Sequence, residues 1–330
     1  MKPGISVIIC CYNGAARLPE TLRHLALQQV SPQISWEIII VDNASTDGTG
    51  AVAHTEWQQY NLPGVNFNVL SEKRPRKYYA LQTGVAKAVH EFIVICDDDN
   101  RLNHNYINQA FQIISSNNKI AAVGGRGIAV SDGQIPGWFW QYQHIYAVGK
   151  PAAGSGDVSA KGYLWGAGMV FRKSLYDRVN RDVPSLLLGP DQQETARAED
   201  VELCMRFIMA GYRLYYDEAL VFEHFIDSTR LTDSYRNKLL DAGSHEIRVL
   251  NLYRKQIAIN NLPAIQKAWL LCATLLRYFT CKVFPGLRTW NYQYEAEVLY
   301  MLTGLKITGI SDEAAGIGAL NRSLSKKSIA

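Results

Sequence analysis

Three consecutive aspartates, Asp97 to Asp99, follow four strand-forming residues, Ile93 to Cys96. Adjacent carboxylates repel one another, so this cluster needs a positive partner. Carboxylate oxygens at the end of a strand suit a hard divalent cation and the phosphates that it neutralises, or the hydroxyls of a ribose. Asp is also common where a strand enters a turn, and turn formation is the competing interpretation.

A second acidic pair, Glu199 and Asp200, opens a segment with helical periodicity that ends before Gly211. The sequence of this segment alone leaves open whether the pair has a chemical role. Acidic residues also stabilise the first turn of a helix through the helix dipole, and this structural interpretation stays open. Glu202 and Arg206 stand four residues apart on the same segment, which predicts an ion pair along one helix face.

The first half of the chain alternates between strand and helix patterns, which predicts a doubly wound, mainly parallel sheet with right-handed crossovers. Polar residues follow three of these strands: Tyr12 and Asn13, Asp42, and Asp97 to Asp99. Ligands bind beyond the carboxyl ends of the strands in such sheets, so we expect the three polar ends to face one crevice. Strands are expected at residues 5–11, 37–41, 65–70 and 92–96, and helices at residues 18–29, 48–58 and 78–90.

Beyond Asn100 the pattern becomes mixed. Strands are expected at residues 121–124, 163–172, 213–216 and 220–222, and helices at residues 106–115 and 199–210. From about residue 234 the chain has a helical character, and its last twenty or so residues, rich in small side chains, are expected to fray. The chain is therefore divided into a catalytic domain over residues 1–232 and a helical extension over residues 233–330.

The composition is that of a folded globular protein, with 48% hydrophobic and 19% charged residues among 330. A net charge of +4 without a long basic run argues against nucleic acid as a partner. The six cysteines show no metal-site spacing, and we interpret them as buried residues of a reducing compartment. No segment reaches the roughly 18 to 20 apolar residues that a spanning helix needs. We expect a cytoplasmic protein, either free or peripheral on the inner face of the membrane.

Four motifs in a fixed order resemble those of family 2 glycosyltransferases of the GT-A fold. They are Val7–Gly14, Ile39–Thr49, Asp97–Asp99 and Glu199–Arg206, and the resemblance runs over roughly residues 4 to 230. It implies a GT-A type α/β fold, a doubly wound mixed and mainly parallel sheet flanked by helices, here with a C-terminal helical extension.

The resemblance implies that five residues bind a nucleotide: Tyr12, Asn13, Asp42, Asp97 and Asp98. Tyr12 is similar to an aromatic residue that packs near the base. Asp42 is similar to a carboxylate that accepts a hydrogen bond from a base N–H, which suits uracil, and its alternative role is turn formation. Asp97 is similar to the residue that contacts the ribose.

The resemblance further implies that Asp99 binds Mg²⁺ or Mn²⁺, which bridges the diphosphate, and that Asp200 is the general base with Glu199 beside it. Direct displacement by the acceptor hydroxyl would invert the anomeric configuration. His224 stands where some members of the family place a histidine on the metal or the diphosphate, although a structural histidine is the alternative. Trp165, Gly166 and Gly168 are similar to the strand on the acceptor side.

The sequence departs from the family pattern at two places, and one of them is Ala198, where members commonly carry glycine before the Glu-Asp pair. Members often carry an arginine in the third helix, where this chain has Ala80–Gly84. Arg76 or Lys77 is the expected replacement. This departure leaves the identity of the donor sugar open.

The sequence thus predicts an inverting glycosyltransferase that moves a sugar from a nucleotide-sugar donor, with a UDP-sugar favoured, to a saccharide or lipid-linked saccharide of a surface glycan. A sugar nucleotidyltransferase is an alternative, but its Gly-rich basic phosphate loop is poorly matched by Tyr12–Arg17. The second alternative is a glycan-binding module that has no catalytic activity.

An apolar stripe recurs in steps of four and three residues within residues 262–284. It comprises Ile265, Trp269, Cys272, Leu276, Phe279 and Val283. Such a stripe predicts a helix that packs on the catalytic domain or on the second subunit of a homodimer. The other interpretation is a helix that rests on an anionic bilayer.

Overall fold

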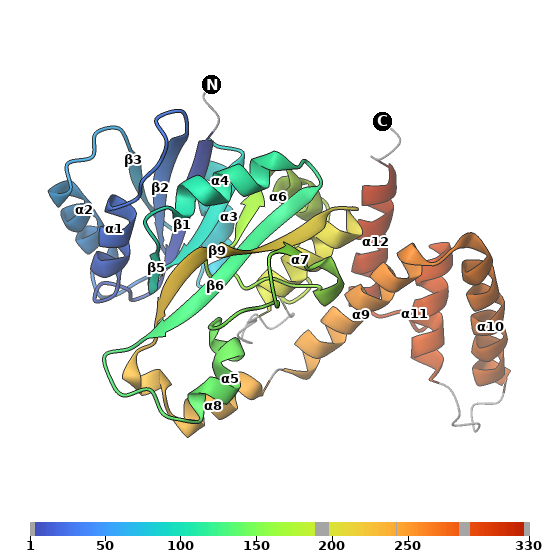
Figure 1. Cartoon of the computed structure of the whole chain (residues 1–330). Helices are drawn as coiled ribbons and strands as arrows, with labels where there is room; N and C mark the ends of the chain where they lie inside the picture. The colour runs from blue at the N-terminus through green and yellow to red at the C-terminus, as the bar shows by residue number, and fades with distance from the viewer. Residues whose placement is uncertain (1–3, 189–197, 242, 284–290, 327–330) are drawn as a thin grey trace. The chain divides into compact units, whose positions relative to one another are not determined.

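The computed structural model describes residues 4–188, 198–241, 243–283 and 291–326 (Figure 1). The chain forms two compact units. The first comprises residues 1–177 and 212–242, and the second comprises residues 178–211 and 243–330. This division differs from the boundary expected at residue 232, because residues 178–211 group with the C-terminal helices.

The first unit is built on a mixed sheet, in which the described residues contribute nine strands in the order β3-β2-β1-β4-β8-β6-β9-β5, with β7 beside β9. Pairing is parallel from β3 through β4 and between β6 and β9, whereas β8, β5 and β7 run antiparallel to their neighbours. The strands are β1 (Gly4–Cys11), β2 (Ser35–Asp42), β3 (Asn66–Ser71), β4 (Phe92–Asp97), β5 (Asn100–Leu102), β6 (Ile120–Val130), β7 (Gly156–Asp157), β8 (Val170–Arg172) and β9 (Arg213–Phe225).

Helices cover this sheet: α3 packs on β1 and β2, and α4 packs on β6 and β9 (Figure 1). The helices of this unit are α1 (Leu18–Ala26), α2 (Thr49–Gln59), α3 (Lys77–Lys87), α4 (Tyr106–Ser116), α5 (Phe139–Tyr142) and α8 (Asp233–Leu240), with 3-10 turns η1 (Gln143–Tyr146), η2 (Ser159–Lys161) and η3 (Ser228–Arg230). Helix α6 (Lys173–Asn180) runs across the boundary between the units.

The central strands are buried on both faces, which is why β1, β2 and β4 consist mostly of apolar residues. Their pairing fixes which residues end together. Cys11 of β1 lies opposite Asp42 of β2, and Cys10 lies opposite Asp97 of β4. The register therefore brings the polar ends of three strands to the same edge of the sheet, as the sequence predicted.

Several expected elements differ from those observed. The strand expected at residues 163–172 is limited to β8, and the two strands expected at residues 213–222 form the single strand β9. The expected fraying of the last twenty residues is wrong for the described part of the tail, where α12 (Asp312–Lys326) is a helix. Its Ala314, Ile317, Leu320 and Leu324 are buried, and this apolar face holds the helix in place.

The second unit consists of α7 (Glu199–Met209), α9 (Ser244–Asn261), α10 (Ala264–Val283), α11 (Tyr292–Thr303), α12 and the end of α6. Arg206 of α7 is fully buried. It pairs with Glu202 at 2.8 Å, as the four-residue spacing predicted, and donates to the hydroxyl of Tyr253 on α9 at 3.0 Å. Helix α7 is thus tied to α9. Among the described residues no helix combines the length and hydropathy needed to cross a bilayer.

Candidate active site

A cavity of about 510 Å³ lies in the first unit at the carboxyl ends of β1 and β4. Polar and charged side chains from several loops converge on it, as expected for a ligand site in an open α/β sheet. It is lined by Cys10, Cys11, Tyr12, Arg17, Asn43, Lys77, Asp98, Asp99, Phe225, Asp227, Thr229, Arg230 and Tyr235.

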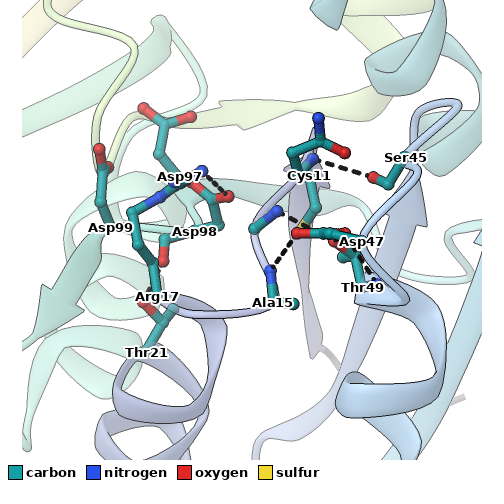
Figure 2. Close-up of polar contacts among 12 residues, drawn as sticks. Cys11, Ala15, Arg17, Thr21, Ser45, Asp47, Thr49, Asp97, Asp98 and Asp99 are labelled. Carbon is teal, nitrogen blue, oxygen red and sulfur yellow. Dashed lines mark hydrogen bonds and ion pairs between the residues drawn. The ribbon is translucent and has the colours of Figure 1, made fainter.

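Each of the three aspartates has a basic partner. Arg17 donates from Nη2 to Oδ2 of Asp98 at 2.7 Å, and Arg230 donates from Nη1 to Oδ2 of Asp99 at 3.0 Å. Lys77 forms an ion pair with Asp97. Figure 2 shows the three carboxylates beside Arg17. The cluster thus meets the requirement for positive partners that the sequence imposes.

Asp98 and Asp99 lie almost fully buried in the turn between β4 and β5. Burial and the neighbouring charge of Asp99 raise the pKa of Asp98 to about 6, although Arg17 opposes the shift. Burial also opposes ionisation of Asp99, but His224 and Arg230 hold its pKa below the ordinary value. Asp99 therefore stays the more strongly ionised of the two.

His224, near the end of β9, contacts two oxygens. Its Nδ1 lies 2.7 Å from the carbonyl oxygen of Tyr146, and its Nε2 lies 3.4 Å from Oδ1 of Asp99. Because a carbonyl only accepts, we assign a hydrogen to Nδ1. Burial lowers the pKa of His224, but the Asp99 carboxylate raises it by more, so the net shift is upward. The protonated ring is a counter-ion for Asp99, and only the neutral ring, with the Nε2 lone pair exposed, suits a metal.

The described residues contain no group of three or more His, Cys, Asp or Glu side chains arranged to hold a metal ion. Magnesium in nucleotide sites is often held by one or two carboxylates together with phosphate oxygens of the substrate. The Asp99 carboxylate, at the wall of the cavity, fits such a cation when a diphosphate supplies the other ligands.

The loops after β1 and β2 are tied together by hydrogen bonds. The N–H of Asn13 donates to Oγ of Ser45 at 3.0 Å, and Oδ1 of Asn13 accepts from the N–H of Thr46 at 2.9 Å. The N–H of Ala15 donates to Asp47 at 3.0 Å, and Figure 2 shows this contact beside that of Ser45. The ties hold Tyr12, which is 62% exposed, at the rim of the cavity.

Asp42 and Asn13 do not line the cavity. Oδ1 of Asp42 accepts from the N–H of Ser45 at 3.1 Å, which is the turn contact that sequence reasoning kept as its alternative role. The neighbouring residue Asn43 does line the cavity, and its Oδ1 accepts from the N–H of Arg76 at 2.9 Å.

Glu199 and Asp200 lie in the first turn of α7, in the second unit. Oδ1 of Asp200 accepts from the N–H of Val201 at 2.8 Å. Both residues stand in the first turn, where acidic side chains stabilise a helix. They do not line the cavity, whose lining residues all belong to the first unit.

The expected acceptor residues Trp165, Gly166 and Gly168 do not line the cavity either. Gly168 has a φ of +70°, and a Cβ there would lie 2.4 Å from the hydroxyl of Tyr106, which donates to the Gly168 carbonyl at 2.6 Å. Packing against Tyr106 is thus sufficient reason for this glycine. Trp165 and Gly166 are half-buried in the turn before β8.

Sequence reasoning did not assign Arg17, Arg230 or Tyr235 to the site. Arg230 donates from Nε to the hydroxyl of Tyr235 at 3.0 Å, so Tyr235 orients the guanidinium that meets Asp99. The available signal was position, because Arg17 follows β1 closely and Arg230 follows β9 closely.

Comparisons with known proteins point to one family. The model described as Glycosyl transferase family 2 matches residues 6–179, more than half of the chain. Glycosyltransferase AglE of Haloferax volcanii is 23% identical over 284 residues, which cover 83% of this chain and 82% of that protein. Glycosyltransferase GlyG of Streptococcus pneumoniae serotype 4 is 30% identical over 124 residues, which cover 38% of this chain and 39% of that protein. The crystal structure of S. aureus TarS 1-349 in complex with UDP aligns with a TM-score of 0.48 and 14% identity over 98% of this chain and 91% of that one.

Proposed function

The chain belongs to glycosyl transferase family 2 and is a glycosyltransferase, and on that premise we propose that it transfers a sugar with inversion from a nucleotide-sugar donor to a saccharide or lipid-linked saccharide acceptor. We favour a UDP-sugar as the donor and a glycan of the cell surface as the product. Uracil suits the role that the family resemblance gives to Asp42, since uracil presents a ring N–H to a carboxylate.

The observation that carries the proposal is the set of three basic residues on the aspartate cluster. Arg17, Lys77 and Arg230 all line the cavity at the carboxyl ends of the strands. A departing nucleoside diphosphate gains negative charge on its phosphate oxygens, and fixed positive groups stabilise that charge where it develops. Guanidinium groups are well suited to this task because they present paired donors to phosphate.

The aspartates have a complementary task. When the basic side chains turn to the diphosphate, the carboxylates become free to accept hydrogen bonds from ribose hydroxyls. We assign this contact with the ribose to Asp97, with Asp98 beside it. We assign Asp99 to a divalent cation, Mg²⁺ or Mn²⁺, with His224 in its neutral form as the second candidate ligand. A bound cation would supply further stabilisation of the leaving diphosphate.

We assign the general base to Asp200, with Glu199 beside it. The base removes the proton from the acceptor hydroxyl as its oxygen attacks the anomeric carbon from the face opposite the diphosphate. The bond from the anomeric carbon to the phosphate oxygen breaks as the new glycosidic bond forms, and the nucleoside diphosphate leaves with the electron pair. Trp165, Gly166 and Gly168 remain our candidates for the acceptor side.

The test measures release of nucleoside diphosphate from a panel of nucleotide sugars, with and without Mn²⁺ and with a panel of saccharide acceptors. We expect release with a UDP-sugar and a loss of about 10²- to 10⁴-fold in Asp200→Asn, the usual contribution of a general base. Asp312→Asn is the matched control, because Asp312 also lies in the first turn of a helix, and we expect its rate to stay within about twofold of the parent.

The outcomes separate the alternatives. Equal rates in Asp200→Asn and the parent would refute the general base. Formation of a nucleotide sugar from a sugar phosphate and a nucleoside triphosphate would identify a nucleotidyltransferase. Binding of glycans without any nucleotide binding would identify a glycan-binding module.

A further inference from the structure

Helix α10 has apolar side chains on two opposite faces. On the inner face Thr274, Tyr278 and Cys281 are buried, and Tyr278 packs with Ala296 and Leu299 of α11. An amphipathic helix that packs on one neighbour normally shows polar residues on the opposite face. The outer face of α10 does not follow this rule.

The outer face carries the stripe that the sequence predicted, here called the outer stripe. Ile265 is 78% exposed, Trp269 77% and Leu276 71%. Phe279 and Val283 are 56% and 64% exposed, and Cys272 is exposed as well. The stripe runs for about 27 Å at the usual rise of a helix. A continuous apolar surface of this kind marks an interaction site.

The charged residues of α10 are all basic, and one of them is exposed. Lys282 is exposed, whereas Lys267 and Arg277 are half-buried, and Lys267 donates to the carbonyl oxygen of Asn260 at 3.0 Å. The two acids of the neighbouring α11 are buried, Glu295 at 3% exposure and Glu297 at 5%. Glu295 lies 3.3 Å from Arg277, so the charges of these two side chains offset one another.

We propose that the outer stripe lies on the surface of an anionic lipid bilayer. Helices that rest in the interface combine Trp, Phe and Leu on one face with Lys and Arg beside it, and α10 has this composition. Trp is favoured at the level of the lipid headgroups, and anionic lipids attract the exposed Lys282. Helix α10 does not meet the requirements for a spanning helix, so it lies along the interface.

A second copy of the chain fits this surface less well. In a two-fold symmetric dimer the same stripe would meet itself, and neither α10 nor α11 presents an exposed acid to pair with Lys282 of the other copy. Anionic lipid supplies the charge that this arrangement lacks.

The test is flotation of the full chain with vesicles of phosphatidylcholine containing phosphatidylglycerol, and with phosphatidylcholine alone. We expect the parent to float with the anionic vesicles and to remain mostly unbound with the neutral ones. The double variant Trp269→Glu and Leu276→Glu should bind anionic vesicles at least about tenfold more weakly, because it places charges in the apolar stripe. Far-ultraviolet circular dichroism of this variant should match the parent, since neither residue is buried.

The control is the double variant Leu240→Glu and Ile247→Glu, which changes exposed apolar residues of α8 and α9 outside the stripe and should float like the parent. All six cysteines lie in the described residues and Cys272 alone is exposed, so an environment-sensitive dye on Cys272 gives a second readout. Its emission should shift to the blue with anionic vesicles.

Three results would overturn the proposal. The first is a parent that stays unbound with anionic vesicles, and the second is a stripe variant that floats as well as the control. A parent that elutes as a dimer, and that the stripe variant converts to a monomer, would show that a second copy covers the stripe. None of these measurements depends on catalysis, so their failure leaves the proposed function untouched.

Discussion

At the scale of single residues, Arg76 is where backbone strain and the candidate site coincide. Its φ of +119° is unusual for a residue with a side chain, and such strain costs of the order of 1–3 kcal/mol. Its N–H donates to Asn43, a residue of the cavity wall, and its Nη1 is buried without a hydrogen-bond partner in the described structure. A strained residue with an unsatisfied guanidinium nitrogen beside a cavity is consistent with a ligand contact.

We therefore predict opposite effects of Arg76→Gly on stability and on binding. The glycine relieves the backbone strain, so the free energy of unfolding in urea should rise by about 1 kcal/mol. The affinity for UDP, measured by calorimetry, should fall about tenfold because a charge-assisted hydrogen bond to the ligand is lost. Asn61→Gly is the control, since exposed Asn61 also has a positive φ, of +48°, and its substitution should leave UDP affinity unchanged. Unchanged affinity in Arg76→Gly would remove Arg76 from the donor site.

The sequence predicted the edge of the sheet at which the site lies and named Lys77 as a candidate, but not the two arginines that complete the site. Asp97 to Asp99 follow directly from strand β4, so a local pattern is enough to place them. The partners Arg17 and Arg230 reach the aspartates from loops 81 and 131 residues away along the chain. No local periodicity encodes such a pairing, because it depends on the order of strands in the sheet.

At the scale of elements, the connection between β3 and α3 is held by one carboxylate. Glu72 accepts from the guanidinium and the N–H of Arg74 and from the hydroxyl of Thr83 on α3, the last at 2.7 Å. These hydrogen bonds, first of all those from Arg74, hold the pKa of Glu72 well below its ordinary value of 4.5. The carboxylate thus ties α3, the helix that carries Lys77 to the cavity, to the loop that precedes it.

This lowered pKa makes part of the stability depend on pH. A group whose pKa is lower in the folded state stabilises that state above its unfolded pKa, and the contribution fades as pH falls toward the folded value. We predict that Glu72→Gln lowers the melting temperature at pH 7 and that the difference from the parent shrinks steadily below pH 4.5. Glu218→Gln, at an exposed ion pair with Lys150, should change the melting temperature little at any pH. A constant difference between Glu72→Gln and the parent across this range would show that the charge of Glu72 is not responsible.

The elements that the sequence predicted well are those with a strong period of their own. The alternating strands and helices of the first hundred residues match the observed ones within a few residues, because buried parallel strands and amphipathic helices leave different patterns. Strand β9 was predicted in two pieces because Asp217 and Glu218 interrupt its apolar pattern. Pairing with β6 continues on both sides of a register shift at Gly124 and Arg126, so the neighbouring strand overrides the local pattern.

At the scale of the whole molecule, the division into units depends on contacts that are distant in the sequence. Arg206 of α7 donates to the carbonyl oxygens of Val183 and Pro184 and to the hydroxyl of Tyr253, which in turn donates to Glu202 at 2.8 Å. These are buried groups, and removing one partner of a buried ion-paired network costs about 3–5 kcal/mol. A boundary at residue 232, which the change to helical composition suggested, would separate α7 from Tyr253.

We predict that a chain ending at residue 241 loses the structure of α7 while the sheet survives. Removal of α9 to α12 exposes Arg206 and Glu202 and deletes the tyrosine that bridges them, so α7 keeps too few contacts to stay folded as a single helix of 11 residues. Hydrogen exchange should show at least about tenfold faster exchange for the amides of α7 in the truncated chain, and unchanged protection for β1 and β2.

The full-length variant Tyr253→Phe is the matched control, because it removes only the hydroxyl and should cost about 1–3 kcal/mol while α7 stays protected. Equal protection of α7 in the truncated and full chains would mean that the C-terminal helices do not support it, and the boundary near residue 232 would then describe the domains better than the division observed here.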